Sequence, residues 1–432
     1  MKRLIRLLIL AGIVSSITPA PAGAQASSKT LTLEDCIRMA QSAPSLASVA
    51  KQESEIADLG SRQAKAAFLP RSQFDAGYAY NSPLRSNTSV QSYVALNGVR
   101  EYVFLLTASQ EIDTSGRLRA ELARARAERD AAGANAFLTQ RDLRRGVTSA
   151  YYRLLLARHL TQALHDSVTE AEGFEKRVRL LLENGEAAQA DVVKASAEVA
   201  LLRQAQIGAE LDAKVANHEL ASFWTTAVAE PLAIVDVFEQ PLAPEGEAAA
   251  AAGASPFLKR PEFGLLEAQR RSFVEESRRL RAGLLPQASV NFQYGLDANG
   301  VRAGDHGYAV FVNLNVPVFD WLRTLDAAKQ SRLRAEQTET SRAIAERVFS
   351  REYESAQARV GMNFEQVSVA AAQVKLAEEN LRLSRIRFDG GEGSALEVVA
   401  AQSGLAQARG NYYTSIANYW NARADREVAA GR

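Results

Sequence analysis

Two long stretches of the chain repeat their apolar positions at helical spacing and contain no proline. No proline occurs between Pro83 and Pro231, nor after Pro317. Because proline interrupts a helix, these are the regions in which long helices can form. The sequence predicts helices over about 115–183 and 321–388, each spanning roughly 100 Å at 1.5 Å per residue. Helices of that length indicate an elongated molecule, since they cannot be the core element of a globule.

Each predicted long helix ends in a glycine turn, and a return helix follows it. The turns carry nearly the same motif, GEAAQADVV from Gly185 and GEGSALEVV from Gly391. Glycine favours the left-handed conformation that commonly ends a helix. The return helices are predicted to extend to about Trp224 and Glu427. The chain therefore contains two similar helical hairpins.

The second long helix carries two heptad stripes of apolar residues on nearly opposite sides, because two positions along a helix correspond to about 200° of rotation. One stripe contains Val360, Val367, Val374, Leu381 and Phe388, and the other contains Met362, Val369, Leu376 and Leu383. A two-stranded coiled coil needs only one such seam. Two seams predict a neighbouring helix on each side, as in a wall of helices. Charged residues between the seams argue against the alternative, a fully buried central helix.

A shorter helix and a strand hairpin precede each long helix. The shorter helices are predicted over 32–67, where Thr32 and Asp35 form a capping-box pattern, and over 261–283. Both stop near a proline, Pro70 or Pro286, which opens an extended segment. After each hairpin an aspartate, Asp113 or Asp320, is placed to cap the long helix.

The extended segments alternate between apolar and polar residues with period two. In the second half, Ala288, Val290, Phe292 and Tyr294 oppose Gln287, Ser289, Asn291 and Gln293; in the first half, Phe74, Ala76, Tyr78 and Tyr80 oppose Gln73, Asp75, Gly77 and Ala79. Second strands are predicted over 308–316 and 102–112, the latter with less distinct faces. Strands of this length and pattern suit a membrane-spanning wall that is apolar outside and polar inside.

Four strands cannot close a barrel, and an open edge in lipid leaves unpaired backbone groups that cost several kcal/mol each. Copies of the chain must therefore share one barrel. Two copies would supply eight strands, whose interior side chains fill, whereas three would supply twelve and enclose an aqueous lumen. The polar row of Gln287, Ser289, Asn291 and Gln293 favours the larger barrel and predicts a lumen lining.

The N-terminus resembles a secretory signal peptide over residues 1–24. Lys2, Arg3 and Arg6 precede an apolar run, and Ala22-Gly23-Ala24 supplies a small-residue cleavage site. Cleavage would remove three of the 51 basic residues and leave 48 against 50 acids, a charge that argues against nucleic acid as a partner. No later segment has the length and apolarity of a transmembrane helix. The single cysteine, Cys36, is predicted to be a small buried apolar residue, because it follows no lipobox.

These features together resemble the TolC-type outer membrane efflux proteins over essentially the whole mature chain. The residues that carry the resemblance are the start Leu31-Thr32-Leu33-Glu34-Asp35, the matching words Phe68-Leu69-Pro70 and Leu284-Leu285-Pro286, the two glycine turns, and the closing Asn411-Tyr412-Tyr413. The resemblance implies a mainly α fold with a small β part and two internal repeats. In a homotrimer, a twelve-stranded outer-membrane β-barrel in lipid would continue into a long periplasmic α-helical barrel. It also implies a periplasmic adaptor and an inner-membrane pump as partners.

The resemblance further implies roles for the turns at the periplasmic tip. Asp191 and Glu397 would occupy the acidic constriction rings. The adaptor-docking turns would be Gly185, Glu186 and Ala187 in the first hairpin, and Gly391, Glu392 and Gly393 in the second. Gly393 and Ala400 stand where some members have a basic residue and a second acid, which puts their salt-bridged latch in doubt here. Ser394 also forms a capping-box pattern with Glu397, which would use that carboxylate locally, whereas Ala188 gives Asp191 no such partner.

The organisation expected is a first repeat over 25–225, a Pro- and Ala-rich equatorial linker over 226–260, and a second repeat over 261–432. The histidines show no metal-ligand spacing, and no nucleophile elbow or phosphate loop occurs, so we expect no enzyme, no cofactor and no metal site. The predicted function is a passive outer-membrane duct for small molecules or ions. Two alternatives remain: a duct for type I protein secretion, and, from another class, a soluble periplasmic coiled-coil scaffold or adaptor.

Overall fold

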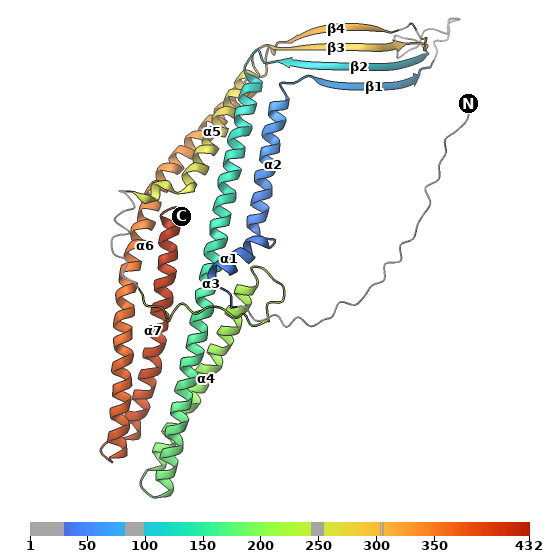
Figure 1. Cartoon of the computed structure of the whole chain (residues 1–432). Coiled ribbons are helices and arrows are strands. Elements are labelled where there is room, and N and C mark those ends of the chain that lie inside the picture. Colours follow the sequence, from blue (N-terminus) through green and yellow to red (C-terminus); the bar gives the residue numbers. More distant parts are fainter. Residues whose placement is uncertain (1–29, 83–98, 243–254, 303, 305) are drawn as a thin grey trace, which may run out of the picture.

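The computed structural model describes residues 30–82, 99–242, 255–302, 304 and 306–432. The molecule is elongated, with a small sheet at one end and two helical hairpin tips at the other (Figure 1). The predicted signal peptide, residues 1–24, lies outside the described residues. So does the central part of the predicted linker, residues 243–254.

The elements follow the same order in both halves of the chain. The helices are α1 (Leu33–Ser42), α2 (Leu46–Ala66), α3 (Arg117–Glu183), α4 (Gln189–Ala221), α5 (Pro261–Ala282), α6 (Arg323–Asp389) and α7 (Ala395–Ala429). The strands are β1 (Arg71–Tyr80), β2 (Arg100–Ile112), β3 (Gln287–Ala298) and β4 (Gly307–Asn315). The two predicted long helices are confirmed, and α3 and α6 contain 67 residues each.

The first predicted helix, 32–67, is wrong as a single element, because the chain forms two helices there. Pro44 removes a backbone donor and keeps Ala43 extended, at φ −80° and ψ 155°. Ser45 then precedes α2, and its backbone N–H donates to the hydroxyl of Ser48 at 3.0 Å. The predicted capping box of Thr32 and Asp35 does form at the start of α1. The sequence pattern therefore identified the helical region and missed the bend within it.

Asp113 and Asp320 bind the first turns of α3 and α6 from a few residues upstream. The carboxylate of Asp113 accepts from the backbone N–H groups of Leu118 and Arg119, at 3.0 and 3.3 Å. Asp320 accepts from the N–H of Thr324 at 3.0 Å. Both satisfy donors that a helix start leaves unpaired, as predicted. The residues directly before the helices are instead Gly116 and Leu322, both left-handed.

The four strands form one antiparallel sheet in the order β1-β2-β3-β4, so β1 and β4 are its free edges within one chain. The register places Gln73, Thr107 and Gln293 side by side across three strands. It likewise places Phe74, Leu106, Tyr294 and Tyr308 in one row. The sheet therefore has an apolar face and a face that carries the predicted amide row. The register also assigns the faces of β2, which the sequence left indistinct.

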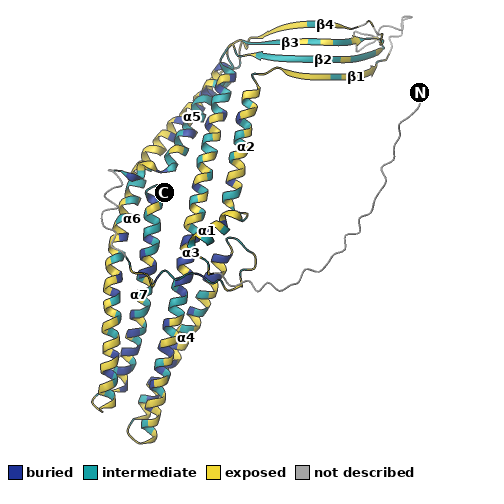
Figure 2. Cartoon of the chain, in the orientation of Figure 1, coloured by how far each residue is buried: buried dark blue, intermediate teal, exposed yellow. Residues whose placement is uncertain are grey.

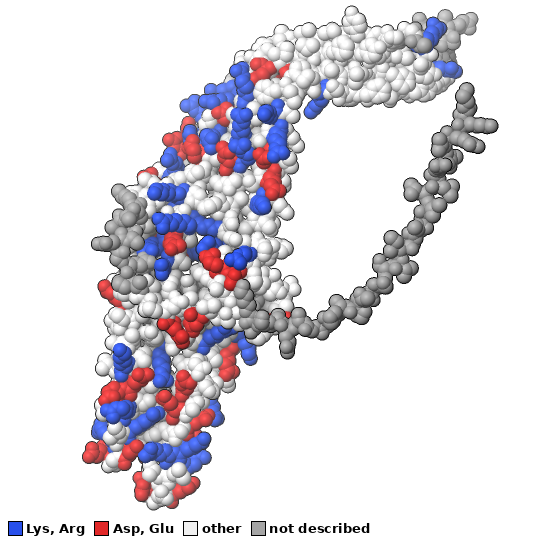
Figure 3. Space-filling model, in the orientation of Figure 1, with Lys and Arg blue, Asp and Glu red and all other residues white. Residues whose placement is uncertain are grey.

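Charge is distributed very unevenly between the sheet and the helices. The visible side of the sheet carries almost no Lys, Arg, Asp or Glu along its length, whereas both signs are interspersed over the helices (Figure 3). Large apolar side chains of the sheet remain exposed, including Tyr308 at 77% and Val312 at 74%. Figure 2 shows the same contrast in burial, with the buried residues concentrated on the helices. An uncharged apolar surface of this kind is what a lipid-facing sheet presents.

The two apolar seams of α6 differ in what they contact. On the first seam, Val360, Val367 and Leu381 are buried within the chain. On the second, Met362, Val369, Leu376 and Leu383 remain 47–72% exposed. One seam therefore packs inside the protomer, and the other faces outward without a neighbour among the described residues of the chain.

The largest core lies at mid-length, where α1, α3, α4, α6 and α7 contribute side chains. Leu31 and Ile234 form a parallel β-bridge there, and the Tyr151 hydroxyl donates to the carbonyl of Val235 at 2.6 Å. Cys36 is fully buried in this core, as predicted, and burial raises the pKa of its thiol to about 11. A second core, near the tips, joins the two helical hairpins.

Candidate functional site: the two hairpin tips

Both hairpin tips use the same backbone turn. In the first, Glu186 N–H donates to Leu181 O at 2.8 Å and Gly185 N–H to Leu182 O at 2.9 Å. In the second, Glu392 N–H donates to Arg387 O and Gly391 N–H to Phe388 O, at 2.9 and 3.0 Å. These are the paired bonds of a Schellman motif, which places a left-handed residue after the helix. Gly185 and Gly391 supply it, with φ of 78° and 73°.

The six predicted docking residues lie together on these two turns. Gly185, Glu186, Gly391 and Glu392 are exposed, and Ala187 and Gly393 are partly buried. Gly393 is the most constrained, because a Cβ there would lie 3.0 Å from the backbone nitrogen of Phe388. Its counterpart in the first tip is Ala187. The turns thus share a path, but the second is tighter.

Asp191 lies in the first turn of α4, next to the buried Val192. The carboxylate is 3.6 Å from the ammonium group of Lys194 and is 26% exposed. Ala188 precedes the helix and supplies no side-chain cap. The carboxylate is therefore fixed on the flank of the hairpin near the tip, with one distant and exposed cation beside it.

Glu397 occupies the matching place in α7, next to the buried Val398, but has a stronger partner. Its carboxylate is 3.0 Å from the guanidinium of Arg387, at the end of α6. The predicted capping box is only half formed: the Ser394 hydroxyl accepts from Glu397 N–H at 3.4 Å. Sequence reasoning missed Arg387. The available signal was a basic side chain in the last turn of a helix, where it can also bind the turn's carbonyls.

Charged and aromatic contacts connect the two hairpins just above the tips. Arg177 of α3 is 3.0 Å from Asp389 at the end of α6. Phe174 and Phe388 pack edge to face, with ring centroids 5.1 Å apart. The buried Glu198 of α4 accepts from the hydroxyl of Ser403 on α7 at 2.6 Å. The two tips are therefore held side by side by contacts that the sequence motif does not reveal.

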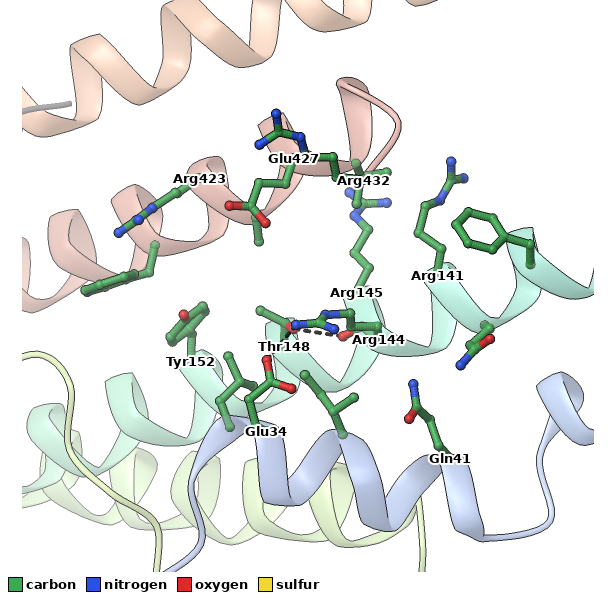
Figure 4. Close-up of a pocket in the computed structure, with 17 residues that line it drawn as sticks. Glu34, Gln41, Arg141, Arg144, Arg145, Thr148, Tyr152, Arg423, Glu427 and Arg432 are labelled. Atoms are coloured by element: carbon green, nitrogen blue, oxygen red, sulfur yellow. Dashed lines mark hydrogen bonds and ion pairs between the residues drawn. The ribbon is translucent and has the colours of Figure 1, made fainter. Parts of the chain in front are cut away.

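A hollow of about 610 Å³ lies higher up, between α1, α3 and α7. Figure 4 shows arginines of α3 between acidic residues of α1 and α7. Arg144 pairs with Glu34 at 2.5 Å, and Arg145 pairs with Asp425 at 2.8 Å. These ion pairs join three helices at mid-length. We assign the hollow a structural part, because acids of the chain pair with these two arginines.

Among the described residues, no cluster of three or more His, Cys, Asp or Glu side chains is placed to hold a metal ion. Within the same residues, no helix combines the length and apolarity required to cross a membrane. The chemistry available at the tips is thus that of carboxylates, backbone amides and apolar packing.

The sequence profile described as outer membrane efflux protein matches residues 38–226 and 258–430. The chain belongs to the outer membrane efflux protein family. This confirms the predicted family, and with it a non-catalytic efflux channel of the outer membrane with a large periplasmic helical part. The soluble-scaffold alternative is thereby removed. No curated protein matches the sequence.

Solved structures of bacterial outer membrane channels share the fold. The CmeC channel of Campylobacter jejuni superposes with a TM-score of 0.82 at 16% identity, covering 92% of this chain and 85% of that one. VceC of Vibrio cholerae gives 0.79 at 16%, covering 92% and 96%. The open-state MtrE channel of Neisseria gonorrhoeae gives 0.78 at 18%, covering 92% and 88%. At these identities the likeness concerns the fold, and it confirms the predicted mainly α architecture with two repeats.

Proposed function

We propose that three copies of this outer membrane efflux protein form one continuous passive duct for small molecules or ions. The observation that carries this proposal is the four-stranded sheet with an uncharged apolar face and two free edges, β1 and β4. In lipid, each unpaired backbone group at such an edge costs several kcal/mol. Pairing β4 of each copy with β1 of the next removes all the edges, and twelve strands enclose an aqueous lumen.

The outer seam of α6 supports the same assembly in the periplasmic part. Met362, Val369, Leu376 and Leu383 form an exposed heptad row at one side of the protomer. At the other side, α4 exposes Val193, Ile207 and Leu211, at 58–69%. Apolar rows on opposite sides of one chain fit a closed ring in which each copy packs against the next. Members of the family form trimers, which agrees with the three copies proposed here.

We assign the lumen of the barrel to the amide row of β3. Ser289, Asn291 and Gln293 share the face opposite the apolar row. Gln287 lies at the foot of the sheet, where its side-chain amide donates to Ser115 and to the carbonyls of Ala282 and Leu285. Gln287 therefore also joins the sheet to the helices below, whereas the other three are available to water.

At the periplasmic tips we assign the constriction to Asp191 and Glu397, three of each around the axis. Rings of carboxylates favour cations over anions in a narrow pore. The exposed Gly185, Glu186, Gly391 and Glu392 would receive a periplasmic adaptor, which in turn connects to an inner-membrane pump. The two glycines carry no side chain, which lets a partner approach the backbone closely. Which substrate passes through the duct, whether a drug, an ion or a protein, depends on that pump.

The assembly is tested with the mature protein purified in detergent. We expect a trimer by light scattering, a heat-modifiable band on SDS gels, and circular dichroism with a strand contribution beside the helical one. A freely soluble monomer with a purely helical spectrum would contradict the proposal. In planar bilayers, the double variant Asp191→Asn, Glu397→Gln should lower the cation preference and raise the conductance. An unchanged current–voltage curve would remove the constriction assignment and leave the trimer intact.

A further inference from the structure

The connectors that lead from a strand into a long helix differ between the two halves. In the first half, the residue before α3 is Gly116, with φ of 80°. In the second half, the two residues before α6 are Trp321 and Leu322, with φ of 55° and 65°. A side chain with a Cβ is unfavourable in this left-handed region, where glycine is not. The second connector therefore keeps two large residues in a strained backbone that the first avoids.

The side chains of Trp321 and Leu322 have little packing within the described chain that could compensate for this strain. Trp321 is 81% exposed and Leu322 is 57% exposed. The neighbouring Phe319 is 68% exposed and contacts Trp321 edge to face at 4.9 Å between ring centroids. Strained residues persist where their surroundings over-determine them, and they cluster at sites of recognition. Three large apolar side chains on one exposed connector thus lack the packing that would stabilise its backbone conformation.

A matching cavity lies at the opposite side of the protomer, between the end of α2 and the first turns of α3. Its volume is about 470 Å³. Phe68, Leu69 and Leu122 form apolar walls, and Arg62, Lys65 and Arg126 supply basic side chains around them. Basic groups over an indole face form favourable cation–π contacts. The apolar walls and the basic rim of the cavity therefore suit an aromatic residue.

The free strand edges determine which parts of neighbouring copies meet. β4 ends at Asn315, directly before this connector, and β1 begins at Arg71, directly after Leu69 and Pro70. β4 runs toward the helices and β1 runs away from them (Figure 1). Antiparallel pairing of β4 with β1 of the next copy thus places the connector of one copy beside the α2–β1 junction of the other.

We propose that Trp321, with Phe319 and Leu322 beside it, inserts into the cavity at the foot of α2 in the next copy. The occupant is a second copy of this chain, and the inference rests on the proposed trimer. The contact is head to tail, as a closed ring requires. Burial of the indole in the neighbouring copy supplies the packing that the single chain lacks. The left-handed residues aim the side chain outward.

Disulfide crosslinking tests the contact in the full-length mature trimer. In a Cys36→Ala background, Leu69→Cys combined with Trp321→Cys should link neighbouring copies under mild oxidation and give covalent dimers and trimers on non-reducing gels. The matched control replaces Ile56 instead of Leu69; Ile56 is equally exposed but lies about 15 Å back along α2 from its end. A trimer in which the 69–321 pair links no better than the 56–321 pair would overturn the inference.

Trimer dissociation on heating in detergent gives a second, independent measurement. We expect Trp321→Ala to accelerate it on the order of tenfold, as for a buried aromatic anchor at an interface. Phe104→Ala is the control. Phe104 is exposed on the apolar face of β2, and β2 is an inner strand that pairs with β1 and β3 of its own chain and with no neighbouring copy. Trp321→Gly separates strain from packing, because glycine relieves the left-handed backbone and also removes the indole. If strain alone mattered, this variant would dissociate more slowly than the wild type. We expect it to dissociate faster, because the packing is lost.

A rival occupant of the connector is the membrane interface, where tryptophan is also favoured. In that case the trimer would form, the 69–321 pair would remain unlinked, and Trp321→Ala would dissociate like the wild type in detergent. That outcome overturns the inference and leaves the proposed trimer intact. A wild-type chain that is monomeric in detergent would instead overturn both.

Discussion

The two halves of this chain follow one plan, and they differ most at the ends of their long helices. At the tips, both turns are Schellman motifs with a left-handed glycine, yet the acids beyond them have different surroundings. Among the residues that the structure describes, Asp191 has only Lys194 as a nearby cation, at 3.6 Å, whereas Glu397 is paired with Arg387 at 3.0 Å. A repeated motif thus fixes the backbone of both tips but leaves the charge at each tip to its local partners.

The largest expected difference between the tips concerns the tightness of the turns. Gly393→Ala forces a Cβ to within 3.0 Å of a backbone nitrogen, and overpacking of this kind costs about 2 kcal/mol. Amides of the second tip should then exchange hydrogen about 30-fold faster. Ala187→Gly, at the matching place in the first tip, should change exchange there by less than about fivefold. Mass spectrometry of tip peptides measures both, and equal effects would mean that the turns are not different.

The next difference concerns the two carboxylates. If each carboxylate of Asp191 lies about 8 Å from the axis, three of them contribute about 1.5 kcal/mol to a cation there in a water-like dielectric. Asp191→Asn should therefore lower the cation-to-anion preference about tenfold, measured from reversal potentials at low salt. Glu397→Gln should have a smaller effect, because Arg387 already offsets that charge. A larger effect of Glu397→Gln would reverse the comparison.

The two halves also differ at the starts of α3 and α6, in the partners of the capping aspartates Asp113 and Asp320. Burial raises the pKa of Asp113, but its hydrogen bonds to Arg119 and to the N–H groups of Leu118 and Arg119 outweigh burial and hold the pKa below its usual value. A depressed pKa means that the stabilisation is complete above the unfolded value of about 3.9 and is lost as pH falls through the folded pKa.

Asp113→Ala should consequently destabilise the chain by about 1 kcal/mol at pH 7, and the difference from wild type should shrink below about pH 4. Thermal melting followed by circular dichroism at several pH values measures it. Asp320→Ala is the matched variant, and we expect a smaller change because Asp113 also pairs with Arg119 at 2.8 Å, whereas Asp320 accepts mainly from the backbone of Thr324 and Leu322 and from the Thr324 side chain. A pH-independent loss in Asp113→Ala would contradict the capping role.

The smallest predicted effect tests the partner of Glu397 directly. Arg387→Gln removes the cation that offsets this carboxylate, so the cation preference of the channel should rise about threefold at low salt. Lys194→Gln should raise it less, because Lys194 is farther from its acid. If Arg387→Gln instead lowers the preference, the guanidinium does not act through Glu397.

Much of the architecture could be predicted from local pattern. Proline-free stretches predicted α3 and α6, and period-two alternation predicted the strands and their polar face. The missed bend at Pro44 has a local cause that was visible in the sequence. For the missed partner Arg387, the sequence showed a basic residue in the last turn of a helix, but Glu397 lies ten positions later and only the folded turn brings the two side chains together.

The sequence by itself determined the lengths of the two long helices, the glycine turns and the faces of β1, β3 and β4, because these depend on neighbours within a few residues. Tertiary structure decided the rest: which seam of α6 is buried, which acid at the tips has a close cation, and which connector keeps two residues in left-handed strain. Each of these depends on groups that are distant in the chain and meet only when the helices pack. Local pattern specifies the elements, and packing determines the charge and exposure on which a channel depends.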